Sequence, residues 1–231
     1  MKIEILFPEL CNLYGDSFNA RYLSMCFKDA TIYNTSINSK PKFLTEDVNI
    51  IYLGSCSEKH QEMIISKLIK YKDIIKEYIN DGKILIATGN SLEIFEEYII
   101  DDDKKIEALG IFKGYAVRNM KKRHNSLFLG EYKGIKVIGH KSQFTFSYNN
   151  DKKFIEKKRG VGMSESDNNE GICYKNFYGT YLLGPFLVFN PDLTKKILKI
   201  KKLPFEKETY DAYNYRLKEF LNPKTDFISK H

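Results

Sequence analysis

The chain has 231 residues and a mass of 27.0 kDa, and its 42% hydrophobic residues supply enough apolar side chains for one ordinary core. Its 37 Lys and Arg against 30 Asp and Glu give a net charge of +7, which fits either an acidic ligand or a lysine-rich surface. The longest apolar runs stop well short of the roughly 20 residues that cross a bilayer, so we expect no membrane span. The N-terminus predicts a first strand and not an export signal, which indicates a cytoplasmic protein.

Short β-branched runs alternate with longer amphipathic segments in the N-terminal part of the chain, a rhythm typical of a parallel sheet covered by helices. We expect strands there at 2–7, 30–34, 48–53 and 83–87, helices at 17–28 and 91–99, and one or two helices at 57–80. The middle third alternates with the shorter period of antiparallel strands and ends in polar loops, and we place the strands within 115–148 and the loops at 160–162 and 164–170. The remaining elements are short strands and two helices, at 172–175, 177–182, 191–199 and about 205–221. The fold class is therefore α/β, a mostly parallel sheet covered by helices with added antiparallel strands.

Four cysteines are scattered along the chain without the spacing of a zinc site, at positions 11, 26, 56 and 173. In a reducing compartment they predict free and mostly buried thiols instead of a disulfide framework. We therefore expect no metal and no cofactor.

The excess positive charge is concentrated near the C-terminus, where residues 191–231 hold 10 basic and 6 acidic side chains. The lysines between 195 and 202 are spaced so that Ile197, Leu198 and Ile200 turn inward on a helix. This spacing favours a solvated basic face over a nucleic-acid site, and the same face could dock against an acidic partner protein.

A buried strand passes directly into a helix through small residues between Ile84 and Ser91. Such a turn presents its apex, here assigned to Thr88, at the carboxyl edge of a sheet, with the N–H groups of Gly89 and its neighbours at a helix N-terminus. This geometry normally serves a nucleophile, although a plain strand-to-helix connection explains the segment equally well. A second loop with small residues, Gly54 and Ser55, follows the preceding strand and also opens a helix, which places donors on the opposite side of the same crevice.

These segments, in this order, resemble class I glutamine amidotransferases of the cobyric acid synthase type. Within them the resemblance is strongest to the glutaminase subunits of lipid II isoglutaminyl synthases. The similarity covers about residues 1–200 and rests on five blocks of sequence, namely Phe7-Pro-Glu-Leu-Cys-Asn-Leu-Tyr-Gly-Asp16, Leu53-Gly-Ser55, Ala87-Thr-Gly89, Gly139-His-Lys-Ser-Gln143 and Asn168-Asn-Glu-Gly171 with the Gly179–Pro191 signature.

The resemblance also exposes four departures from the family. In these enzymes a cysteine at the strand-to-helix turn attacks the glutamine side chain, and a histidine before a Gly-Pro turn acts as its base. Aligned with them, Thr88 takes the nucleophile position and Leu183 the base position, while Lys141 and Gln143 replace the family's glutamate and second histidine. A threonine hydroxyl without an adjacent base is a weak nucleophile, so the resemblance implies that glutaminase chemistry is lost.

Two side chains remain as candidates for other roles near this crevice. Cys56, with His60 four residues further on, is a possible displaced nucleophile and base, against the simpler interpretation of a small buried thiol and a surface histidine. Arg123 matches a family arginine near the site entrance, or it belongs to a solvated basic patch. His124 and His140 are candidates by residue type only.

The resemblance implies a degenerate amidotransferase-like domain at 1–202 and a helical extension at 203–231 packed on the same domain. It further implies a Mur-ligase-like synthetase partner that this chain supports or regulates, with glutamine or a related small molecule as the ligand of Gly54, Ser55, Gly89, Arg123 and Gln143. The alternatives are an active amidotransferase or hydrolase that uses Cys56, and a basic binding module without such a partner.

Overall fold

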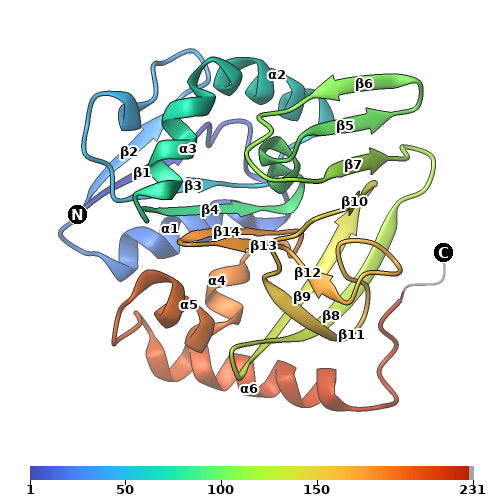
Figure 1. Ribbon diagram of the computed structural model, residues 1–231. Coiled ribbons are helices and arrows are strands. Elements are labelled where there is room, and N and C mark those ends of the chain that lie inside the picture. The colour runs from blue at the N-terminus through green and yellow to red at the C-terminus, as the bar shows by residue number, and fades with distance from the viewer. Residues whose placement is uncertain (229–231) are drawn as a thin grey trace.

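The computed structural model describes residues 1–228, and its centre is a six-stranded sheet (Figure 1). All neighbouring strands in this sheet are parallel except the first pair, which is antiparallel. In spatial order the strands are β13 (Ile172–Tyr174), β14 (Phe177–Thr180), β4 (Ile84–Thr88), β3 (Ile50–Leu53), β1 (Lys2–Leu6) and β2 (Thr31–Thr35).

Helices cover both faces of this sheet because its central strands are apolar on both sides. Ile51 and Leu53 of β3 pack with α2 (Glu58–Leu68) and α3 (Lys72–Asn80), which are joined by the short 3-10 helix η3 (Ile69–Tyr71). Ile50 and Tyr52 point to the opposite face, where the other helices lie. Those helices are α1 (Asp16–Cys26), α4 (Phe186–Phe189) and α5 (Pro191–Leu198).

Two smaller sheets lie to the right of the main sheet in Figure 1. They contain the antiparallel strands predicted for 115–148. Each has four strands. The first has the order β10 (Thr145–Tyr148), β7 (Tyr115–Arg118), β5 (Tyr98–Asp101) and β6 (Lys104–Glu107). The second has the order β12 (Asn169–Glu170), β11 (Ile155–Arg159), β8 (His124–Tyr132) and β9 (Ile135–Gln143).

The helix predicted at 91–99 is wrong. The segment forms the 3-10 helix η4 (Gly89–Phe95) and then enters β5. The backbone carbonyl groups of Ile94 and Phe95 accept hydrogen bonds from the N–H groups of Leu109 and Phe112, so tertiary pairing replaces the helical ladder. The predicted loop at 164–170 is also wrong at its end, because Asn169 and Glu170 pair with β11.

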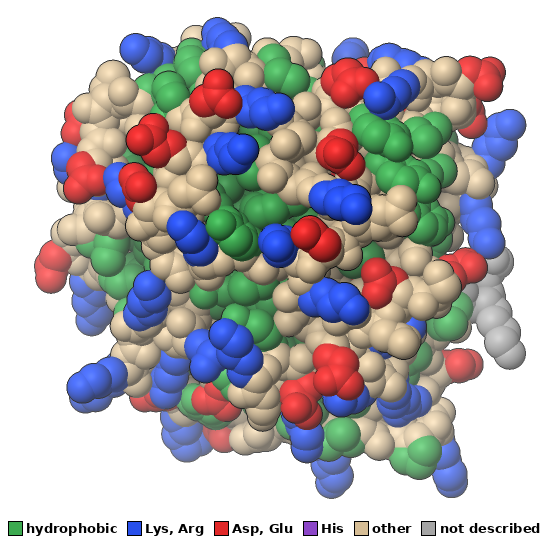
Figure 2. Space-filling view, in the orientation of Figure 1, with side chains coloured by type: hydrophobic (Ala, Val, Ile, Leu, Met, Phe, Trp, Pro, Cys, Tyr) green, Lys and Arg blue, Asp and Glu red, His purple; other side chains and the backbone are tan. Residues whose placement is uncertain are grey.

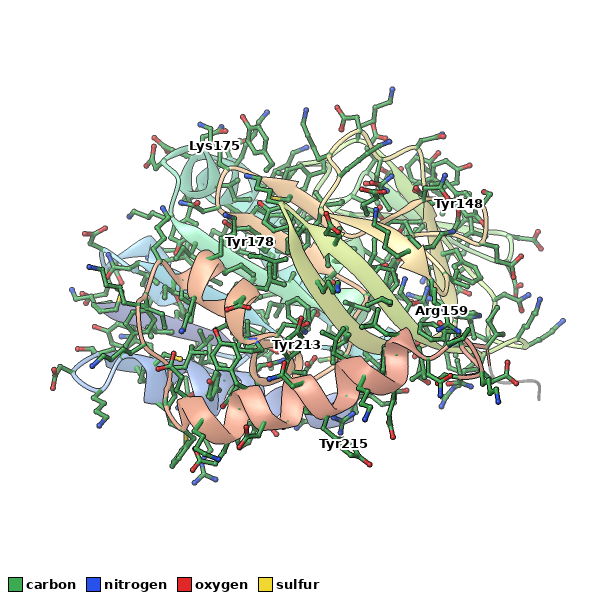
Figure 3. All side chains as sticks on the ribbon, turned by 90° about the horizontal axis from the view of Figure 1, so that it is seen from below. Tyr148, Arg159, Lys175, Tyr178, Tyr213 and Tyr215 are labelled. Carbon is green, nitrogen blue, oxygen red and sulfur yellow. The ribbon has the colours of Figure 1, made fainter. Side chains whose placement is uncertain are left out.

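The last helix, α6 (Glu206–Leu221), lies across β8 and β9 (Figure 3). Tyr213 turns toward these strands and donates a hydrogen bond from its hydroxyl to the carbonyl oxygen of Lys136 at 2.8 Å, whereas Tyr215 points outward. The helix predicted at about 205–221 is therefore confirmed, and the division of the chain at residue 202 stays a prediction. Within residues 1–228, no helix has the length and apolarity needed to cross a membrane.

Asn190 connects the helical layer to β9, and its replacement should destabilise the protein. Its side chain accepts from the N–H of Ile138 at 2.8 Å and donates to the carbonyl oxygens of Ile138 and Phe186, both at 2.9 Å. Asn190→Ala leaves these buried backbone groups without partners, and we expect it to lower the free energy of unfolding by about 3 kcal/mol. Urea denaturation measures the effect, with the exposed Asn168→Ala as control. Equal stability of the two variants would contradict this role.

Candidate functional site

A cavity of about 180 Å³ lies where the carboxyl ends of β3, β4 and β14 meet. Parallel strands bring their following loops to one edge of the sheet, which is the usual place for a ligand in this class of fold. The cavity is lined by three of these loops, by the N-terminal turn and by β9 with the residues around it, namely Leu13, Tyr14, Ser55–Glu58, Gly89, Asn90, Arg123, Ser142–Thr145, Tyr181 and Leu183.

The buried carboxylate of Asp16 holds two of these loops together. One of its oxygens accepts hydrogen bonds from the backbone N–H of Ser55 at 2.5 Å and from the hydroxyl of Thr88 at 2.9 Å. Its other oxygen accepts from the side chain of Asn19 at 3.0 Å. Burial raises the pKa of this carboxyl group, and the hydrogen bonds from Ser55 and Thr88 act in the opposite direction.

The assignment of Thr88 to the apex of the turn after β4 is wrong. Thr88 is the last residue of β4, has an extended backbone (φ −116°, ψ 152°) and is completely buried beside Asp16 and Tyr52. The residue with the left-handed conformation is Gly89, with φ at +61°. The left-handed position of this turn, which lines the cavity together with Asn90, therefore has no side chain.

Gly89 is tightly enclosed by the other walls of the cavity. A Cβ atom on it would lie 2.5 Å from the Cβ of Ser55 and 3.3 Å from Cδ2 of Leu183. Gly89, and not Thr88, the residue assigned to the nucleophile position, is therefore the residue next to Leu183. Leu183 is buried and lines the cavity with an alkyl side chain, which cannot accept a proton.

Gly54 lies behind the cavity wall and not on it, contrary to its prediction as a ligand-binding residue. A Cβ atom there would lie 2.6 Å from the carbonyl oxygen of Cys11, so this position requires glycine for close packing. Its own carbonyl oxygen accepts a hydrogen bond from the hydroxyl of Ser91 at 2.5 Å. The other predicted ligand-binding residues, Ser55, Gly89, Arg123 and Gln143, all line the cavity.

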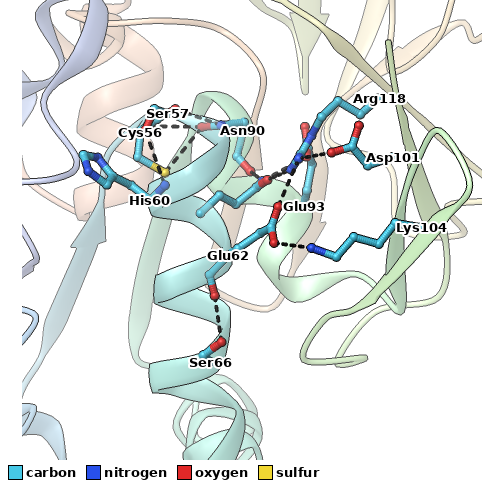
Figure 4. A network of polar contacts seen from close by, with 11 residues as sticks. Cys56, Ser57, His60, Glu62, Ser66, Asn90, Glu93, Asp101, Lys104 and Arg118 are labelled. Carbon is cyan, nitrogen blue, oxygen red and sulfur yellow. Dashed lines mark hydrogen bonds and ion pairs between the residues drawn. The ribbon is translucent and has the colours of Figure 1, made fainter. Parts of the chain in front are cut away.

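Cys56 lines the cavity but does not form a pair with His60 (Figure 4). Ser57 is the N-cap of α2, so Cys56 precedes the helix and the two side chains do not share a helical face. The imidazole of His60 makes no hydrogen bond to the thiol, which lies 3.8 Å from the side-chain oxygen of Asn90. The neighbouring Cys56 and burial together raise the pKa of the Cys11 thiol, which keeps that thiol protonated.

Two polar side chains that line the cavity, Arg123 and Gln143, differ in their exposure to solvent. Arg123 is exposed at the entrance, with its guanidinium 4.5 Å from the ring centre of Phe144. Gln143 is buried and donates from its side-chain nitrogen to the carbonyl oxygen of Thr145 at 2.5 Å, while its side-chain oxygen has no partner in the protein. Among the side chains of residues 1–228 that line the cavity, this oxygen is the one buried polar atom without a hydrogen-bond partner in the protein.

Lys141 does not reach the cavity, because its ammonium group is completely buried and pairs with Glu170. It also donates to the carbonyl oxygen of Gly162 at 2.6 Å. Glu170 in turn accepts from the hydroxyl of Thr180 at 2.9 Å and the N–H of Tyr181 at 2.6 Å. Burial lowers the pKa of Lys141, with the nearby carboxylate acting in the opposite direction. The Lys141–Glu170 pair thus fixes the end of β14 that leads to Leu183.

Two buried glutamates beneath the cavity were not predicted. Burial raises the pKa of Glu93 to about 7 and that of Glu96 to about 8. Glu93 accepts from the side chain of Gln61, whose oxygen accepts from Arg118 at 2.6 Å (Figure 4). Both lie in the segment predicted to be a helix at 91–99, and no local pattern marks their burial. No group of three or more metal-binding side chains occurs within the described part of the chain.

Comparison of the sequence with known proteins identifies the family of the chain. The model of the CobB/CobQ-like glutamine amidotransferase domain matches residues 2–191. The chain belongs to this family. Among curated members, it is 28% identical over 207 residues to the GatD subunit of lipid II isoglutaminyl synthase (glutamine-hydrolyzing) from Staphylococcus aureus, covering 87% of this chain and 85% of that protein. The subunit of the same name from Streptococcus pneumoniae is 27% identical over 208 residues, covering 86% and 79%.

Solved structures of glutamine amidotransferases share the fold at low sequence identity. One crystal structure of a glutamine amidotransferase has a TM-score of 0.58 at 12% identity and covers 85% of this chain and 97% of its own. A glutamine amidotransferase from Thermotoga maritima has a TM-score of 0.53 at 10% identity and covers 97% and 87%. The α/β fold expected from the sequence is therefore confirmed, as is the resemblance to the family.

Gly89→Ala tests the enclosure of the turn. Alanine at this position has both an unfavourable φ and a clash with Ser55, so we expect a loss of about 3 kcal/mol in the free energy of unfolding. Gly134→Ala is the matched control, because Gly134 also has a positive φ (+81°) but nothing within 4 Å of the added Cβ. If Gly89→Ala lowered the free energy of unfolding no more than Gly134→Ala does, the turn would have room for a side chain, contrary to this prediction.

Glu96 should make stability fall as pH rises. Its carboxyl group has a pKa of about 8 in the folded protein against an ordinary value of 4.5, so between these pH values the folded protein binds more protons than the unfolded chain. The free energy of unfolding therefore decreases by up to about 1.4 kcal/mol per pH unit for this group. Urea titrations across this range should show a shallower decline for Glu96→Gln than for the exposed control Glu208→Gln. Identical pH profiles would rule out a buried neutral Glu96.

Proposed function

We propose that this chain is a glutaminase-inactive, amidotransferase-like subunit that acts as a scaffold or regulator of a Mur-ligase-like synthetase in cell-wall precursor amidation. The relatives named as subunits of lipid II isoglutaminyl synthase support the process and the synthetase partner. The proposed inactivity rests on the turn after β4, where Gly89 occupies the left-handed position and lines the cavity.

Hydrolysis of a glutamine side chain through a covalent intermediate needs a nucleophile and a base within hydrogen-bond reach of one another. At the turn that normally supplies the nucleophile, Gly89 offers only hydrogen, and Thr88 is buried behind it with its hydroxyl bound to Asp16. Across the cavity, Leu183 offers only an alkyl group. In this proposal the turn after β4 therefore has no nucleophile, and the position of Leu183 has no base.

Two backbone N–H groups in the loop after β3 are also not free to bind a ligand. An oxyanion is stabilised by N–H groups that point at it without other partners. The N–H of Ser55 donates to Asp16, and the N–H of Cys56 donates to the side-chain oxygen of Asn90 at 3.1 Å. Both N–H groups already have acceptors inside the protein. They are therefore not available to stabilise the oxyanion of a tetrahedral intermediate.

The second candidate function is glutamine hydrolysis through Cys56, which is favoured by the presence of its side chain on the cavity wall. Two observations weigh against it. Cys56 is only 3% exposed, and within residues 1–228 no histidine or carboxylate accepts a hydrogen bond from its thiol. A cysteine nucleophile is usually activated by an adjacent general base, and neither His60 nor a carboxylate is hydrogen-bonded to Cys56 among residues 1–228.

The cavity itself remains available for a non-reacting ligand. The free side-chain oxygen of Gln143 accepts a donor, and Arg123 at the entrance attracts a carboxylate. Glutamine or a related small molecule carries both groups. In this proposal the ligand would report amino-acid supply to a cytoplasmic synthetase without being cleaved.

Ammonia release from glutamine tests the proposed inactivity. We expect the purified chain to release no more ammonia than buffer, with or without a candidate synthetase, and Cys56→Ala to leave this result unchanged. A family member with an intact cysteine and histidine serves as the positive control. Release that Cys56→Ala abolishes would establish the second candidate function instead.

A further inference from the structure

The last turn of α5 and the connection to α6 form a strongly basic segment, defined here as residues 195–205. It contains lysines at 195, 196, 199, 201 and 202 and no acidic residue. Lys195 pairs with Glu206, whereas the other four lysines are exposed and make no ion pair among residues 1–228. The connection between the two helices lies at the lower left of Figure 1, where Figure 2 shows several basic side chains.

The basic segment ends in an aromatic side chain that the protein holds in solvent. Phe205 is 67% exposed, and its backbone has a left-handed conformation (φ +48°). The backbone here is held by hydrogen bonds, because the carbonyl oxygen of Pro204 accepts from the hydroxyl of Tyr22 at 3.4 Å and that of Phe205 accepts from the N–H of Thr209 at 2.9 Å. The exposure of this ring is therefore a property of a well-anchored turn and not of a loose end.

The neighbouring helix α1 extends the same surface. Phe18 is 40% exposed and stacks on Tyr22 with 6.4 Å between ring centres, and Tyr22 contacts the basic segment through Pro204. Arg21 and Lys28 on or after α1 are also exposed. Two exposed aromatic rings thus flank a group of unpaired cations.

We propose that the basic segment 195–205, with Phe205 as its apolar contact, docks this protein on an anionic lipid surface. Clusters of four or more lysines are attracted to anionic headgroups, and aromatic rings favour the interface between headgroup and hydrocarbon. A protein partner is a weaker fit, because the cores of protein interfaces are depleted in lysine. A single-stranded nucleic acid requires a row of stacking aromatic side chains, and the segment itself has one.

This proposal does not depend on the loss of glutaminase activity, since no residue of the basic segment lines the cavity. A membrane-bound protein would be consistent with either candidate function. The two proposals therefore fail independently.

Co-sedimentation with vesicles tests the proposal on the full chain. We expect binding at low salt to vesicles of equal parts phosphatidylglycerol and phosphatidylcholine, and none to vesicles of phosphatidylcholine alone. The double variant Lys201→Glu/Lys202→Glu should weaken the partition coefficient by at least roughly 25-fold, because each lysine near an anionic leaflet contributes a factor of about five. Phe205→Ser should weaken it several-fold without changing its salt dependence.

Matched controls separate this surface from net charge and from folding. Lys67→Glu/Lys70→Glu makes the same charge change near the end of α2, and Tyr215→Ser removes another exposed aromatic ring. Both should bind like the unmodified chain, and all variants should keep its thermal midpoint. Binding that is equal with and without phosphatidylglycerol, binding that the control double variant reduces as strongly, or tighter binding to a single-stranded oligonucleotide than to the anionic vesicles would overturn the proposal.

Discussion

The carboxylate of Asp16 joins the start of α1, the loop after β3 and the end of β4. It is the first residue of α1, it accepts from the loop after β3 through Ser55, and it accepts from the end of β4 through Thr88. A buried carboxylate is costly unless hydrogen bonds satisfy it, so the three segments are held in one arrangement. The first turn of α1 adds favourable N–H groups at the same end.

This constraint explains how the loops around the cavity are held in place. The turn after β4 needs a residue that tolerates a left-handed backbone, and Gly89 meets this need at no steric cost. The side chain of Ser55 and the alkyl group of Leu183 then close over it. The turn thus keeps its place at the edge of the cavity, with Thr88 buried behind it and a glycine in the left-handed position.

The sequence predicted most of the sheet, because β-branched runs such as Ile84–Thr88 have few other stable arrangements. It failed at 91–99, where pairing of Ile94 and Phe95 with the segment at 109–112 overrides the helical pattern. The motif Ala87-Thr88-Gly89 located the turn to within one residue, but residue order carries no φ value, and Thr88 and Gly89 could be distinguished only in the structure. The buried states of Lys141 and Glu96 depend on strands far away in the chain, and no local signal announces them.

An electrophilic glutamine analogue tests most directly whether the cavity has kept its shape and lost its nucleophile. Such an analogue forms a covalent bond with any activated thiol or hydroxyl that lies where the family nucleophile lies. Intact-protein mass spectrometry after incubation should show the unmodified mass of the chain, whereas a family member with the cysteine gains one adduct. A single stoichiometric adduct on this chain, mapped to Cys56 or Thr88, would contradict the account.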